Sequence, residues 1–309
     1  MIAQLLLYKI IQLFLIMILG FVLVKVKLVK SEDSVVLSKL SLYLFMPAVI
    51  INAFNVEMTN DIMVGLIIAF FTAVLIHIGL FILDCVLKKH FKATSVERAS
   101  IMYSNAGNLI VPLVTYILGE EWLIYSSAYL IVQLVFMWTH GVRLFSKQKI
   151  NAKNILLNVN MLAVLFGFVI MILRLRLPVF IGEIASSLGA MLAPSGMIIA
   201  GMLAASVDFE KMLKIKRLYF VVIARLVIYP VIIVLLLKGI SLIVRIPDID
   251  TVMLISYLAS ITPAASTIMQ FSQIYGKDSY YATAINVVTT IVCVITMPLL
   301  IMFFDLFFA

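Results

Sequence analysis

The chain carries ten apolar stretches, each about as long as the 20 residues that a helix needs to cross a bilayer. They occupy residues 4–24, 35–54, 62–87, 97–118, 123–145, 154–173, 180–205, 217–238, 251–275 and 279–304. The connections between them are short and leave no room for a separate soluble domain. We therefore expect an all-α polytopic membrane protein that forms a single membrane domain over residues 1–309.

Composition excludes the soluble classes of protein. Of the 309 residues, 64% are hydrophobic and 12% are charged, whereas soluble domains contain about 45–50% apolar and about 25% charged residues. Because one soluble core cannot hold this apolar excess, part of it must face lipid. A soluble enzyme, a nucleic-acid-binding protein and a disordered chain are therefore excluded. The two cysteines, Cys85 and Cys293, form no metal-binding or disulfide pattern, and we expect neither a cofactor nor a bound metal.

Basic residues are concentrated in alternate connections between the stretches. One side carries 17 of the 23 lysines and arginines, namely Lys25, Lys27, Lys30, Lys39, Lys88, Lys89, Lys92, Arg98, Arg143, Lys147, Lys149, Lys153, Lys211, Lys214, Lys216, Arg217 and Lys277. The other side carries Lys9, Arg174, Arg176, Lys238 and Arg245. Since basic connections mark the cytoplasmic side, we expect both termini on the non-cytoplasmic side. The first stretch has no basic start and no cleavage site, so we expect it to be retained rather than removed as a signal peptide.

This orientation makes the two halves of the chain enter the membrane in opposite senses, as an inverted repeat requires. LSKLSLYLFMPAVII aligns with ASSLGAMLAPSGMII when Pro47 is placed on Pro194, and TYILGEE (115–121) aligns with SQIYGKD (272–278). Apolar helices also resemble one another by chance. We predict two inverted five-helix repeats mainly because the same helices are selected by a second observation.

Polar and helix-breaking residues interrupt the fourth and ninth stretches. The fourth contains SNAGNLIVP (104–112), and the ninth contains SITPAASTIMQFSQ (260–273). Backbone groups freed by such breaks are tolerated at membrane depth only inside protein or beside a cavity. Two breaks in corresponding positions of the halves predict a transporter binding site. The alternative is that these small and polar residues serve helix packing and kinks.

A half-helix N-terminus exposes unpaired N–H groups and a positive dipole end, which favour an anion. Asn105 and Asn108 can donate and accept hydrogen bonds at the same place. The expected substrate-binding residues are Asn105, Ala106, Gly107, Asn108, Gln133, Thr262, Pro263 and Ser266. Ser104, Pro112 and Pro263 are the expected crossover or hinge residues.

Four other polar residues fall inside the stretches. Gln133 needs a partner or a ligand because an unpaired amide is costly in an apolar setting, and we favour a ligand. His77 and His140 are candidates for proton relay, but we favour structural hydrogen bonding for both. Arg225 can extend to the cytoplasmic interface or supply a fixed positive charge near an anion, and we favour the interface.

No Asp or Glu lies at the middle of a predicted span, so the sequence does not support a carboxylate proton relay. A sodium ion held by carbonyl, hydroxyl and amide oxygens stays open as an alternative. Its candidate ligands are Asn105, Asn108, Thr262, Gln270 and Gln273.

The order and spacing of six motifs resemble the auxin efflux carrier family, in its prokaryotic branch, over essentially the whole chain. The motifs are LSKLSLYLFMPAVI (37–50), NAGNLIVPL (105–113), LGAMLAPSGMIIAG (188–201), RLVIYP (225–230), TPAASTIMQFSQIYGKD (262–278) and TTIVCVITMPL (289–299). The resemblance implies a fold related to the bile-acid sodium symporters, with the fourth and ninth helices broken and crossing. It also implies scaffold helices (about 1–54 and 154–205) that dimerise, and transport-unit helices (about 62–145 and 217–304).

Several site residues carry over from the family. Asn105 matches the asparagine that binds the substrate carboxylate in the plant members, Gln133 with Thr139 matches their glutamine and threonine, and Pro263 matches their crossover proline. Ser104 replaces a proline, Ile50 replaces a serine, and the long loop between the fifth and sixth helices is missing. These departures point away from auxin and toward small organic acids such as malate or malonate, which prokaryotic members are commonly assigned.

We therefore expect a secondary transporter in the cytoplasmic membrane of a prokaryote that moves a small organic anion by elevator-like alternating access. Its expected partners are that anion, the lipid bilayer and a second copy of the chain bound through the scaffold helices, and no nucleic acid. The alternatives are an anion channel, a non-transporting receptor and, last, an intramembrane enzyme. The enzyme is disfavoured because the sequence has no GxSG motif, no paired aspartates and no HExxH motif.

Overall fold

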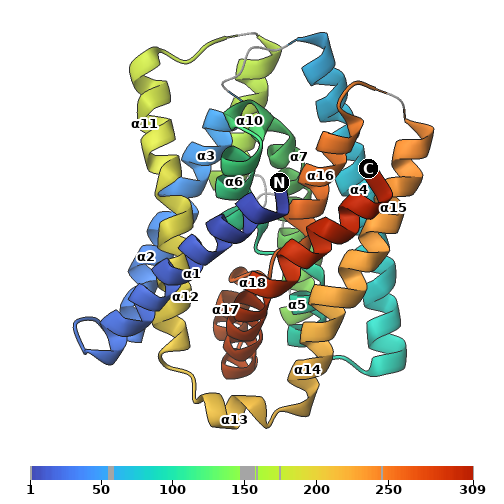
Figure 1. Ribbon diagram of the computed structural model, residues 1–309. Coiled ribbons are helices and arrows are strands. Elements are labelled where there is room, and N and C mark those ends of the chain that lie inside the picture. Colours follow the sequence, from blue (N-terminus) through green and yellow to red (C-terminus); the bar gives the residue numbers. More distant parts are fainter. Residues whose placement is uncertain are drawn as a thin grey trace.

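The structure is a computed structural model that describes residues 2–54, 59–146, 157, 159–173, 175–244 and 246–308. Within these residues it is a bundle of helices without a strand (Figure 1). The α-helices are α1 (Ile2–Lys25), α2 (Ser34–Leu40), α3 (Met46–Ala53), α4 (Asn60–Phe91), α5 (Ser95–Met102), α6 (Ala106–Ile117), α7 (Leu123–Phe136), α8 (Val142–Phe145), α10 (Val159–Ile172), α11 (Val179–Ala190), α12 (Leu192–Ala204), α13 (Phe209–Leu213), α14 (Lys216–Ile223), α15 (Tyr229–Ile243), α16 (Ile249–Ile261), α17 (Thr267–Ile274) and α18 (Ser279–Phe308). Shorter turns are η1 (Ser31–Asp33) and η3 (Glu120–Trp122), which are 3₁₀-helical, and η2 (Ser41–Phe45), η4 (Met137–Gly141) and η5 (Ala224–Ile228), which are π-helical.

Six helical runs are long and apolar enough to cross a membrane. They are Ser31–Ala53, Asn60–Phe91, Glu120–Phe145, Val179–Ala204, Lys216–Ile243 and Ser279–Phe308. Each coincides with a predicted stretch to within a few residues, so the prediction of a multi-pass, all-helical membrane protein is confirmed. Shorter apolar helices, Ile11–Lys25, Ala106–Ile117, Val159–Ile172 and Ile249–Ile261, fall in the four remaining stretches.

Two of the predicted stretches are interrupted by extended backbone. The first break separates α5 from α6, and its residue Tyr103 has φ −95° and ψ 125°. The second separates α16 from α17, and its residue Thr262 has φ −61° and ψ 160°. Thr262 precedes Pro263, and the proline ring drives the residue before it out of helical backbone. The second break therefore follows directly from its sequence.

Two of the π-helical turns end two residues before a proline. η2 is followed by Pro47 near the start of α3, and η5 by Pro230 near the start of α15. Proline has no N–H and cannot complete the regular helical ladder. Turns of this type occur in α-helices mostly as single bulges and frequently at functional sites. The η5 turn contains Arg225, whose side chain reaches both breaks, as described below.

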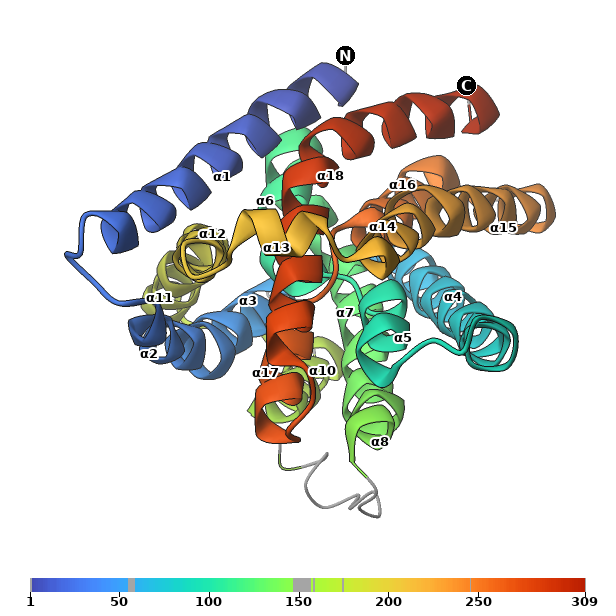
Figure 2. The ribbon, with the colours of Figure 1, turned by 90° about the horizontal axis from the view of Figure 1, so that it is seen from below.

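Helix α1 packs closely on α12. A side chain at Gly201 would meet the backbone of Met17 and Phe21, and a side chain at Gly20 would meet the backbone of Ile198. Small residues permit such close approach between membrane helices. Helix α1 also contacts α18, so the first and last helices of the described chain are neighbours (Figure 2).

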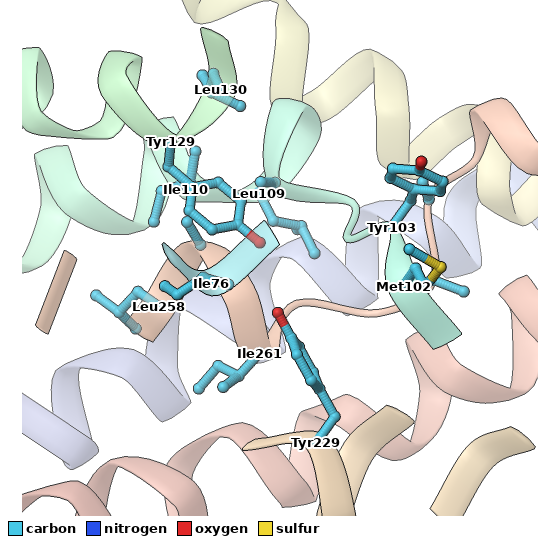
Figure 3. Packing of buried hydrophobic residues seen from close by; sticks show 14 of the residues in the cluster. Ile76, Met102, Tyr103, Leu109, Ile110, Tyr129, Leu130, Tyr229, Leu258 and Ile261 are labelled. Atoms are coloured by element: carbon cyan, nitrogen blue, oxygen red, sulfur yellow. The ribbon is translucent and has the colours of Figure 1, made fainter. Parts of the chain in front are cut away.

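The two breaks lie inside the protein core. Ile101, Met102, Tyr103 and Ile261 are each at most 1% exposed. Figure 3 shows part of this core, with Tyr129 of α7 and Tyr229 of α15 directed toward one another. Because these residues are buried, their freed backbone groups need partners within the protein or beside a cavity.

Basic connections gather at one end of the molecule. The α1–α2 and α4–α5 connections and α13 lie at the lower end of Figure 1, whereas the α15–α16 connection lies at the upper end. Lys147, Lys149, Lys153, Arg174 and Arg245 lie outside the described residues.

Candidate functional site

The two breaks meet at a single point. Ser104 and Ala264 form an isolated antiparallel bridge. The amide of Asn105 donates to the carbonyl of Pro263 (2.8 Å), and the amide of Ala265 donates to the carbonyl of Tyr103 (2.9 Å). Some of the backbone groups that the breaks release are therefore paired with each other. We call residues 103–105 and 262–266 the crossover.

Arg225 binds carbonyl groups at the ends of both half-helices that enter the crossover. Its Nη1 donates to the Ile101 carbonyl of α5 (3.0 Å), and its Nη2 donates to the Ser260 carbonyl of α16 (2.6 Å). Nε and Nη2 both donate to the Thr262 carbonyl, at 3.1 Å and 2.6 Å. Helix C-termini carry unpaired carbonyls and partial negative charge, which suit a guanidinium with its five donors.

The prediction that Arg225 extends to the cytoplasmic interface is therefore wrong. The residue is fully buried, and its guanidinium also lies over the ring of Tyr229, 4.9 Å from the centroid. The physical reason is that three carbonyls, those of Ile101, Ser260 and Thr262, accept four hydrogen bonds from the guanidinium, which satisfy the cation without water. Its position in the sequence did not reveal these acceptors.

Gln133 of α7 holds the first break. Its Nε2 donates to the Ser104 carbonyl (2.9 Å), and its Oε1 accepts from the Ser104 amide (3.1 Å) and hydroxyl (2.5 Å). The amide thus pairs with Ser104 much as a neighbouring strand would. The buried amide that needed a partner or a ligand has a partner, and Gln133 also lines the cavity described below.

Asn286 and Thr289 of α18 hold the second break. Asn286 Nδ2 donates to the Ala264 carbonyl (2.7 Å), and Thr289 Oγ1 accepts from the Ala264 amide (3.2 Å). Sequence reasoning missed both residues. The signal was available for Asn286, because it is an amide within the apolar stretch 279–304, as Gln133 is within 123–145.

A cavity of about 380 Å³ lies beside the crossover. One wall comes from α2, η2, α3 and α12, and the other from α6, α7, η4, α17 and α18. Pockets for small molecules have volumes of about 300–1,000 Å³. The space is therefore sufficient for a small organic ligand.

The cavity brings together most of the predicted site residues. Its lining includes Ser104, Asn105, Gly107, Asn108, Gln133 and Ser266. Ala106 and Thr262 are fully buried and do not line it, and Pro263 takes part in the crossover through its carbonyl. Pro112 lies within α6, but its side chain is outside the described residues.

Unpaired donors gather at the start of α6. Asn108 Nδ2 donates to Asn105 Oδ1 (3.0 Å) and to the Ser266 hydroxyl (3.3 Å), so the Asn105 oxygen is occupied. Within the described residues, no acceptor is found for Asn105 Nδ2 or for the backbone amides of Ala106 and Gly107. Asn105 is the N-cap of α6 without a capping bond from its side chain. Its amide is therefore free to bind a ligand.

The charge of the cavity is positive. Lys39 of α2 is the one charged residue among the described residues that line it. Three serines of the same wall, Ser34, Ser38 and Ser41, add hydroxyl groups. An anion entering the cavity thus meets hydrogen-bond donors and a lysine, and no carboxylate of the described lining opposes it.

The histidines inside the helices make hydrogen bonds within the protein, as predicted. His77 Nδ1 lies 2.7 Å from the Ala73 carbonyl, one turn earlier in α4. His140 Nδ1 lies 2.9 Å from the Tyr103 hydroxyl, and its Nε2 lies 3.4 Å from Asp84 Oδ2. Neither histidine is among the residues that line the cavity.

Comparison with known proteins gives one family match. The model of a family described as membrane transport protein matches the chain over residues 5–155 and again over 148–301. A comparison with curated protein sequences found no significant match.

Proposed function

Since this chain belongs to the membrane transport protein family, that of the auxin efflux carriers, we propose that it is a secondary transporter for a small organic anion such as a carboxylate. The observation that carries this proposal is the cavity beside the crossover. There the free Asn105 amide stands at the N-terminus of α6, and Lys39 is the one charge in the described lining. Unpaired N–H groups at a helix start favour anions.

The substrate carboxylate is proposed to bind the side-chain amide of Asn105 and the backbone amide of Gly107, which both line the cavity. Asn108 and Ser266 support this arrangement because they occupy the oxygen of Asn105 and leave its NH₂ group as the donor. Gln133 contributes by holding Ser104, the residue before Asn105, in extended backbone.

Movement is proposed to occur by elevator-like alternating access, with the transport unit (about 62–145 and 217–304) moving against the scaffold (about 1–54 and 154–205). The side chains that hold the crossover support this division. Arg225, Gln133, Asn286 and Thr289 all belong to the transport unit, and none comes from the scaffold. The crossover can therefore move as part of one body. The cavity lies between the two units, since α2, α3 and α12 are scaffold helices.

We also propose ten spans in two inverted five-helix repeats. The supporting relationship is that α7, which follows the first broken helix, holds its break through Gln133, and α18, which follows the second, holds its break through Asn286. The gathering of basic connections at one end supports a cytoplasmic location for that end, and hence both termini outside. A prokaryotic cytoplasmic membrane and a homodimer formed through the scaffold helices complete the proposal.

The test is uptake of labelled small carboxylates into proteoliposomes at several membrane potentials. A carrier predicts uptake that saturates and is reduced by unlabelled substrate, and its voltage dependence reports the charge that moves. Flux that does not saturate would indicate an anion channel. Binding without flux would indicate a receptor, and neither binding nor flux of any carboxylate by folded protein would overturn the proposal.

A further inference from the structure

A second polar cluster lies on the far side of Tyr103 and outside the cavity. It consists of Asp84 (α4), Arg98 (α5), Tyr103 and His140 (η4), none of which lines the cavity. Arg98 donates to Asp84 through Nε (2.6 Å) and through Nη2. The side chains of Asp84, His140 and Arg98 are 5%, 13% and 14% exposed, so the protein encloses most of the cluster.

The cluster is continuous with the crossover. His140 lies between Asp84 and Tyr103, with Nε2 3.4 Å from the carboxylate and Nδ1 2.9 Å from the phenol oxygen. The same phenol oxygen lies 3.0 Å from the carbonyl of Phe136, the last residue of α7. The backbone carbonyl of Tyr103 accepts from Ala265. A change at His140 therefore reaches the crossover through one residue.

With Nε2 of His140 donating to Asp84, the presence or absence of a hydrogen on Nδ1 decides where Tyr103 donates. A neutral imidazole has one N–H and one acceptor nitrogen, and an imidazolium has two N–H groups. When His140 is neutral and donates from Nε2 to Asp84, its Nδ1 accepts a hydrogen bond from the Tyr103 hydroxyl. The hydroxyl then no longer donates to the Phe136 carbonyl. When His140 is protonated, its Nδ1–H donates to the phenol oxygen of Tyr103. The Tyr103 hydroxyl then donates to the carbonyl oxygen of Phe136.

Few charged groups face His140 from the elements packed around it. From α4 the facing group is Asp84, and from α5 it is Arg98, which already neutralises that carboxylate. Arg143 of α8 lies three residues further along the chain, and α7 and α17 carry no Asp, Glu, Lys, Arg or His. The remaining neighbour is the ring of Phe81, 5.2 Å between centroids. Protonation therefore adds one net positive charge to a cluster that is otherwise balanced.

We propose that His140 binds a proton and transmits its occupancy to the crossover through Tyr103, so that substrate movement is linked to protonation. The step is the addition of a proton from water to an imidazole nitrogen, with no other bond broken. The linkage rests on the proposed function, because it assumes that the crossover moves a substrate. The proton-binding site at His140 does not depend on that assumption.

The first test observes His140 directly and needs no substrate. The chain has only three histidines, so the signals are few enough to assign. Protein labelled with ¹³C at histidine Cε1 is titrated by NMR in lipid nanodiscs, and the His140 signal is assigned by its loss in His140→Gln. We expect this signal to change with pH as the imidazole gains a proton. In Tyr103→Phe we expect the response of this signal to pH to differ from that of wild type, because Nδ1 of His140 loses its hydrogen-bond partner.

A His140 signal that does not change with pH would overturn the proton site, and a pH response unaffected by Tyr103→Phe would overturn the connection to the crossover. The second test measures the pH profile of substrate flux in proteoliposomes. We expect His140→Gln to flatten it, whereas the matched control His90→Gln, at an exposed position in the last turn of α4, keeps the wild-type profile. A wild-type profile in His140→Gln would overturn the linkage. If no carboxylate is transported, the proposed function fails, and the NMR titration still decides the proton site.

Discussion

Arg225 binds the carbonyl oxygen of Thr262 through two of its nitrogens, Nε at 3.1 Å and Nη2 at 2.6 Å. This contact joins the η5 turn to the residue at which α16 ends and the crossover begins. Arg225 is fully buried, and its nitrogens donate to the carbonyls of Ile101 and Ser260 as well as Thr262. Its charge is therefore balanced by helix C-terminal carbonyls rather than by a carboxylate.

Removing the guanidinium should destabilise the protein and abolish transport. In Arg225→Met, three carbonyls lose their donor, and each buried unsatisfied group costs about 1–3 kcal/mol. Arg225→Lys keeps the charge but lacks the planar fork that reaches several carbonyls, so we expect it to restore stability only in part. Thermal melting in detergent measures both variants. The control is Lys216→Met, at an exposed position of α14, and a wild-type melting temperature in Arg225→Met would contradict this role.

Gln133→Leu should reduce stability and flux together. The substitution leaves the Ser104 amide and carbonyl without their partners, at a cost of about 2 kcal/mol or more. Gln270 also lines the cavity, but it makes no such bond to the crossover within the described residues. We therefore expect Gln270→Leu to melt close to wild type. Equal melting temperatures for the two variants would show that Gln133 does not hold the break.

Lys39 should attract the substrate rather than bind it directly. It is exposed at the wall opposite the crossover, and exposed charges act at a range that salt reduces. We expect Lys39→Gln to raise the KM for uptake about 3- to 10-fold at low ionic strength, and less at high salt. Lys39→Arg should behave like wild type. Lys89→Gln serves as the control at another exposed lysine, and an equal effect there would indicate only a change in net charge.

Pro263→Ala should impair flux more than folding. The proline drives Thr262 into extended backbone, and its removal permits α16 to extend into the crossover. Stability should change little, because Arg225 and Asn286 still hold the neighbouring carbonyls. Uptake and melting are measured on the same preparation. Normal uptake would show that the break does not depend on the proline.

The membrane-spanning helices and both breaks could be predicted from the sequence because their signals are local. Apolar length defines the spans, and Pro263 and the SNAGN segment mark the interruptions. The partners of the breaks could not be predicted, because they lie on other helices. The direction of Arg225 depends on carbonyls of α5 and α16, which only the packed fold brings within reach.

Which crossover residues line the cavity was also beyond prediction. Asn105 and Ser266 line it, whereas Thr262 is fully buried with its carbonyl bound to Arg225. The lining residues do not alternate along the chain, since the neighbours Ser104 and Asn105 both line the cavity, as do Ala265 and Ser266. The pattern of residue types in such a segment does not reveal which side is the cavity. Asn286 could have been predicted as a polar site residue, because it is an amide within an apolar stretch, as Gln133 is.

The most direct measurement of the central claim compares uptake of a labelled carboxylate by wild type, Asn105→Ala and the control Asn60→Ala, at an exposed position of α4. Asn105 makes no capping bond from its side chain, so Asn105→Ala should melt near the wild-type temperature. The account predicts that saturable uptake persists in wild type and Asn60→Ala and is lost in Asn105→Ala. Wild-type affinity and uptake in well-folded Asn105→Ala would contradict it.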